Sequence, residues 1–83
     1  MNNTNKQNIV REIIRLMFEY QSVTAGEAPY SIRFDMSERF AHLVITGPDG
    51  SEEWFSSSDI LNTDRPFREA PDALRSIIEK VSA

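Results

Sequence analysis

His42 is the only histidine of this 83-residue chain and the residue best suited to acid–base chemistry near neutral pH. A hydrolytic site would also need a nucleophile within reach of that base and a third group to orient it. The run Ser56–Ser58 offers hydroxyl groups. The strand pairing derived below, however, places Arg33 and Ser56 beside His42 and no carboxylate opposite it. We therefore expect no catalytic residues and interpret the serines as polar residues that lead into a connector.

Metal and cofactor sites are equally hard to build from this composition. The chain has no cysteine, and a single histidine cannot form a histidine-based zinc site. Its glycines are Gly26, Gly47 and Gly50, which are too scattered for a phosphate-binding loop. The acidic residues that could hold Ca²⁺ do not have the spacing of an EF-hand; they are Asp49, Glu52, Glu53, Asp59 and Asp64. We expect no metal and no cofactor.

The balance of charge is acidic, with 9 Lys and Arg against 13 Asp and Glu and a formal net charge of −4. This balance disfavours nucleic-acid binding, because counterion release by basic residues supplies much of its free energy. No stretch approaches the roughly 18 apolar residues of a membrane span. Residues 1–8 are polar and lack the apolar core of a signal peptide. We therefore expect a cytoplasmic protein with no membrane contact.

The first predicted element is a long helix. Residues 1–4 are expected to form a disordered tail. Thr4 and Gln7 have the spacing of a capping box, so the helix is predicted to begin there. It should run to about Thr24, because Gly26 follows and favours a helix end.

This helix is apolar over an unusually wide arc. Its main stripe consists of Ile9, Ile13, Leu16, Met17 and Tyr20. Val10, Ile14 and Phe18 widen the stripe to an arc of roughly 200°. Such an arc suits a helix wedged between a sheet and a second helix. It also suits a helix on which Val10, Ile14 and Phe18 contact a second copy of the chain or another partner.

Three strands are predicted to follow, over residues 29–36, 39–46 and 51–57. The first is the clearest, because apolar residues alternate along it. The second is rich in β-branched and aromatic residues, and the third carries Trp54 and Phe55 at its centre.

Two turns connect these strands. Ser37–Glu38 is predicted to be a tight turn. In the second turn, Pro48 presets φ, Asp49 can bond its own backbone, and Gly50 accepts a left-handed conformation.

A second helix closes the predicted fold. Pro71 suits its first turn, and the helix should end near Ser82. Its apolar stripe consists of Leu74, Ile77, Ile78 and Val81. The sequence thus predicts a single α+β domain over residues 5–83. Its order is α-β-β-β-α, with a three-stranded antiparallel meander and two helices packed on one face.

The two turns also set a strand register. The first turn pairs Met36 with Arg39 and Phe34 with Ala41, and the second pairs Val44 with Trp54. Since directly opposed residues share a face, most apolar residues fall on one face, which is the expected core and has Arg39 and Glu53 as charged exceptions. We call the other face the Trp54 face; it holds Ser31, Arg33, Asp35, Phe40, His42, Val44, Thr46, Glu52, Trp54 and Ser56.

The Trp54 face carries an apolar patch among polar residues. The predicted partner-binding residues are Arg33, Phe40, His42, Val44 and Trp54. Tryptophan and arginine are enriched at interface hot spots, and an apolar patch on a sheet often marks a contact. The alternative interpretation is that the aromatic residues only cover the sheet, or lie beneath residues 58–66.

These features predict a small non-enzymatic protein-binding module, of an accessory, chaperone-like or inhibitor type, that binds another protein or itself as a homodimer. The alternative is a protein that stacks single-stranded nucleic acid on the same aromatic residues. No small-molecule substrate is evident.

The order of elements resembles that of the double-stranded RNA-binding domain. That family carries a lysine cluster at the start of its second helix, where this chain has Glu69–Ala73. The resemblance is therefore one of topology and does not imply RNA binding. The order is also similar to the core of small acidic secretion chaperones, which dimerise and bind proteins, and to compact inhibitors encoded by mobile elements. Neither similarity rests on a sequence motif.

Overall fold

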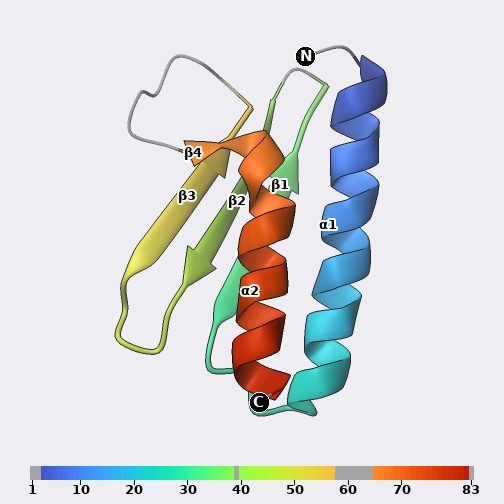
Figure 1. Cartoon of the computed structure of the whole chain (residues 1–83). Helices are drawn as coiled ribbons and strands as arrows, with labels where there is room; N and C mark the ends of the chain where they lie inside the picture. Colours follow the sequence, from blue (N-terminus) through green and yellow to red (C-terminus); the bar gives the residue numbers. More distant parts are fainter. Residues whose placement is uncertain (1–2, 39, 58–64, 83) are drawn as a thin grey trace. The chain divides into compact units, whose positions relative to one another are not determined.

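The computed structural model describes residues 3–38, 40–57 and 65–82 (Figure 1). Its elements, in chain order, are α1 (Asn3–Thr24), β1 (Ser31–Met36), β2 (Ala41–Thr46), β3 (Glu52–Ser56), β4 (Arg65–Pro66), the 3₁₀ helix η1 (Phe67–Glu69) and α2 (Ala70–Ser82). The predicted α+β class is confirmed. The chain forms two compact units, one of residues 1–28 and 71–83 and one of residues 29–70. The packing of both helices on one sheet face stays a prediction.

The helical unit contains α1 and nearly all of α2, which run side by side in the same direction (Figure 1). α1 begins at Asn3, one residue before the predicted start. It ends where Ala25 and Gly26 take positive φ values of 49° and 95°. The Thr24 hydroxyl donates to the Tyr20 carbonyl at 2.9 Å and satisfies one of the last carbonyls of the helix. Neither helix, over the described residues, is long and apolar enough to cross a membrane.

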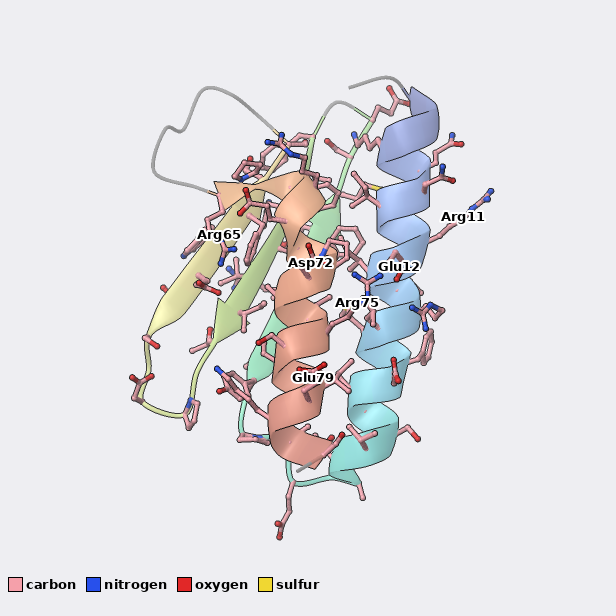
Figure 2. All side chains as sticks on the ribbon, in the orientation of Figure 1. Arg11, Glu12, Arg65, Asp72, Arg75 and Glu79 are labelled. Carbon is pink, nitrogen blue, oxygen red and sulfur yellow. The ribbon has the colours of Figure 1, made fainter. Side chains whose placement is uncertain are left out.

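Polar contacts join the two helices at their exposed edge. The Glu12 carboxylate accepts hydrogen bonds from Arg15 at 2.8 Å and from Arg75 of α2. Arg75 also donates to Asp72 at 2.8 Å. Figure 2 shows Glu12 and Arg75 pointing toward each other between the helices, whereas Arg11 projects outward. The guanidinium groups, Arg15 first, lower the pKa of Glu12.

The predicted apolar stripes of both helices are buried in part; Ile9 and Met17 of the α1 stripe are half-buried. On α1 the buried residues are Val10, Ile13, Leu16 and Tyr20. On α2, Leu74 and Ile77 are buried, and Ile78 and Val81 are half-buried.

The sheet unit has four strands in the order β1-β2-β3-β4. β1–β2 and β2–β3 are antiparallel, but β4 is parallel to β3. The predicted three-stranded antiparallel meander is therefore corrected to a four-stranded mixed sheet. β4 was missed because two residues, one of them a proline, carry no alternating pattern, although a proline is tolerated at a sheet edge. Residues 58–64 of the predicted connector, with Asp59 and Asp64, lie outside the described residues.

The register predicted from the second turn is confirmed. β2 and β3 pair Leu43 with Phe55 and Val44 with Trp54. Gly50 takes a φ of 85° in the turn. The Asp49 carboxylate accepts hydrogen bonds from the Ser51 hydroxyl at 2.7 Å and from the Ser51 N–H at 3.0 Å. These two bonds lower the pKa of Asp49.

The register predicted from the first turn is wrong by two residues. Phe34 lies opposite Leu43, and Met36 lies opposite Ala41. The reason is that the Ser37 N–H donates to the Phe40 carbonyl at 2.7 Å, so the ladder continues one residue beyond the predicted strand end. The pairing predicted for Arg39 lies outside the described residues. A shift of two residues leaves each side chain on its predicted face.

The apolar face of the sheet unit holds its core. Ala41, Leu43, Ile45 and Phe55 are buried. Phe34 stacks on the buried Phe67 of η1, with ring centroids 6.1 Å apart.

Glu53 is a charged residue on this apolar face, and a contact with β4 explains its position. Glu53 forms an ion pair with Arg65 at 2.8 Å. Arg65 also pairs with Glu69 at 3.1 Å and lies 4.8 Å above the Phe55 ring. Glu53 thus holds β4 beside β3.

Candidate functional site

The observed pairing arranges the Trp54 face in three rows across β1, β2 and β3. The first row is Ser31, Thr46 and Glu52. The second row is Arg33, Val44 and Trp54. The third row is Asp35, His42 and Ser56. Directly opposed side chains contact one another, so each row is a local group of interacting residues.

The middle row places Trp54 at the surface. Val44 is only 3% exposed, whereas Trp54 is 39% exposed, and Arg33 on the other side of Val44 is exposed. Among the predicted partner-binding residues, Val44 therefore supports its neighbours and offers little surface itself. Arg33 and Trp54 are the groups of this row that a partner can reach.

Three aromatic rings form a continuous ladder along this face. The Phe40 and His42 ring centroids are 5.1 Å apart with a tilt of 50°. The His42 and Trp54 centroids are 6.0 Å apart with a tilt of 31°. Tilted rings at such distances attract through their edges and faces. The structure thus brings Phe40, His42 and Trp54 together, as predicted.

The residue opposite His42 is a carboxylate, which corrects the expectation from the sequence. His42 Nε2 lies 3.1 Å from Asp35 Oδ2. Arg33, the residue predicted to face His42, lies one row away opposite Val44. Asp35 was missed because of the error in the first register, although alternation along the strand had already placed it on this face. Its carboxylate fixes the orientation of the imidazole ring.

The row of Asp35, His42 and Ser56 has the residue types of a catalytic triad, but it does not have the hydrogen bonds of one. His42 Nδ1 is buried and has no hydrogen-bond partner among the residues described. Ser56 is 6% exposed. A nucleophilic serine needs a hydrogen bond to its base and access for a substrate. Over the same residues, no group of three or more potential ligands is placed to hold a metal ion.

The three residues predicted to form a contact on α1 differ in their exposure to solvent. Val10 is 8% exposed and belongs to the buried stripe. Ile14 and Phe18, one turn apart, are 43% and 68% exposed. Arg11 and Arg15 are exposed on the same helix. This flank of α1 is a second apolar surface, but among the described residues Ile14 and Phe18 form no ring ladder like that of the Trp54 face.

Comparisons with known proteins provide no relative for this chain. No protein-family model matches it, and neither the curated proteins nor the solved structures contain a match. A function must therefore be argued from the surfaces of the chain itself.

Proposed function

We propose that this chain is a small non-enzymatic protein-binding module whose partner contacts Arg33, Phe40, His42 and Trp54 on the Trp54 face. The observation that carries the proposal is the partly exposed Trp54 at the end of an ordered aromatic ladder. Tryptophan is among the residue types most enriched at binding hot spots. Trp54 is accessible to a partner and is supported by its neighbours.

The order of the face supports this role. Asp35 fixes the His42 ring, and that ring contacts both Phe40 and Trp54. Val44 is buried in the middle of the group. Side chains that are already held in place lose little conformational entropy when a partner binds. The aromatic surface is thus prepared for a contact before the partner arrives.

The charges of the face indicate the chemistry of the partner. Arg33 is exposed and forms no salt bridge with any residue that the structure describes. Its five donors can bind a carboxylate with two parallel hydrogen bonds. The complementary surface has an apolar side chain over Trp54 and an acidic residue that reaches Arg33.

The alternative partner is a single strand of nucleic acid stacked on Phe40, His42 and Trp54. The aromatic ladder beside Arg33 supports this alternative. Asp35 and Glu52 flank the ladder, however, and the chain has a net charge of −4, so phosphates are repelled. A protein partner is therefore the better match for the charges.

The substitution Trp54→Ala tests the proposal. Immobilised wild-type chain should retain a partner protein from a lysate of the native host, and Trp54→Ala should lose it because the hot-spot ring is gone. Loss of such an anchor costs about 2 kcal/mol or more, roughly a 30-fold weaker complex. The matched control is Phe18→Ala, which removes an exposed aromatic ring from α1 and should leave capture unchanged. Capture that survives Trp54→Ala but is lost with Phe18→Ala would transfer the contact to α1.

A further inference from the structure

β1 is an edge strand of the sheet and pairs with β2 on one side only. It has six residues, Ser31–Met36, and contains no proline. The opposite edge, β4, has only two residues, one of them Pro66. An edge strand of full length can accept another strand through its unpaired backbone groups.

The hydrogen-bond pattern shows which backbone groups lie at this edge. The Ser37 N–H donates to the Phe40 carbonyl, so bonded and non-bonded pairs alternate from that point. Along β1, the N–H and C=O groups of Ile32, Phe34 and Met36 therefore point away from β2. Within the described ranges, these groups take part in no hydrogen bond outside the ladder.

We infer that the occupant of this edge is a second copy of the chain, whose β1 pairs antiparallel with the first around a two-fold axis at Phe34. In this arrangement, Arg33 lies opposite Asp35 of the partner subunit, and Asp35 lies opposite Arg33 of the partner subunit. Opposite charges in directly opposed positions stabilise a pair of strands, and like charges destabilise it.

The charges also select this register over its neighbours. Moving the axis by one residue would place Arg33 against Arg33, or Asp35 against Asp35. Only the axis at Phe34 pairs both charges with their opposites. Arg33 has no salt-bridge partner among the described residues, and the Asp35 side chain is 62% exposed while one of its oxygens contacts His42.

The apolar side chains of β1 are self-complementary in the same register. Phe34 lies opposite its own counterpart, and Ile32 lies opposite Met36 of the partner subunit. Met36 is 59% exposed, although it is on the apolar face of the sheet. Within the chain, Met36 lies opposite Ala41, and the second copy adds an apolar neighbour on its other side. This inference shares Arg33 with the proposed function, but it uses the edge of β1 and does not need a contact at Trp54.

Charge reversal tests the inference. The mass of the wild-type chain in solution, measured from micromolar to millimolar concentration, should reach twice the 9.5 kDa of one chain. Arg33→Asp and Asp35→Arg should each weaken the dimer about 10- to 100-fold, because both symmetric contacts become repulsive. An equimolar mixture of the two variants should regain the dimer as a heterodimer, and the double variant should regain it as a homodimer. Circular dichroism of each variant verifies that it is folded.

Two outcomes would overturn the inference. One is a wild-type chain that stays monomeric at millimolar concentration, in which case Arg33 and Asp35 guard the edge against pairing. The other is a dimer whose mass is unchanged by both single reversals, or whose loss is not reversed by mixing them. Trp54→Ala should remain dimeric, so a failure at Trp54 is distinguishable from a failure at the edge.

Discussion

Asp35 illustrates how a single residue orders the Trp54 face. It holds the only histidine at 3.1 Å, and that histidine contacts the rings on both sides. His42 Nδ1 is already buried without a partner over the described part of the chain. Removal of the carboxylate would leave both ring nitrogens of a largely buried imidazole unpaired.

We therefore expect Asp35→Ala to lower the free energy of unfolding by about 1 kcal/mol, the cost of one lost partner for a mostly buried polar group. Urea denaturation at low chain concentration, where dimerisation does not contribute, measures this change. Asp35→Asn keeps an oxygen that can accept from His42 and should recover most of the loss. Equal losses in the two variants would show that the contact between Asp35 and His42 is not the cause.

Asp49 makes the stability of the second turn depend on pH. Its hydrogen bonds from Ser51 lower its pKa in the folded chain relative to an unfolded one. A group with a lowered folded pKa stabilises the fold fully above its unfolded pKa, about 4 for aspartate. The stabilisation is lost as pH falls through the lower folded value.

Asp49→Ala should therefore be less stable than the wild type at pH 7, and the difference should vanish in strong acid. Thermal unfolding from pH 7 to pH 2 measures it. Glu52→Gln alters an exposed acid on the adjoining strand and should show no comparable convergence. A difference that stays constant over this range would exclude the carboxylate as its source.

At the scale of the elements, η1 places one buried ring against the sheet. Phe67 is 1% exposed and stacks on Phe34. Phe67→Ala should lower the free energy of unfolding by about 3–5 kcal/mol, because it leaves a cavity the size of a phenyl ring. Phe18→Ala, at an exposed position, should change it by less than about 0.5 kcal/mol. Similar losses in the two variants would contradict the burial of Phe67.

The elements also show how far the sequence determines the fold. The second turn requires a residue with positive φ, and Gly50 is a residue that adopts it readily. The position of this turn and its register were therefore predictable. The first turn contains no residue with such a requirement, and nothing in the sequence showed that Ser37 continues the ladder. Since the error was two residues, the face of each side chain was predicted correctly, but the contact between Asp35 and His42 was not.

The contribution of Arg65 to the sheet was beyond sequence-based prediction for a different reason. Its contacts with Glu53 and Phe55 exist only once β4 lies parallel to β3. A two-residue strand has no pattern of its own. The partial burial of Trp54 likewise depends on its neighbours Val44 and His42 on β2 and not on the local sequence.

At the scale of the whole molecule, both proposed contacts lie on the sheet unit, and Arg33 belongs to each of them. The Trp54 face has an ordered aromatic ladder, and its Arg33 forms no salt bridge with any described residue. Both features support our proposal that this face binds another protein. The β1 edge has charges that complement a second copy of itself. If both contacts form, pairing at β1 extends one sheet into the next and doubles the number of Trp54 faces in the complex.

The emission of Trp54 tests the central claim most directly, because it is the only tryptophan in the chain. When the captured partner protein is purified and added, the emission should move to shorter wavelength and become less accessible to acrylamide, since water is removed from the indole ring. Oligonucleotides at physiological salt should leave the emission unchanged. A saturating complex with the partner protein that leaves both the wavelength and the quenching of Trp54 unaltered would contradict the account.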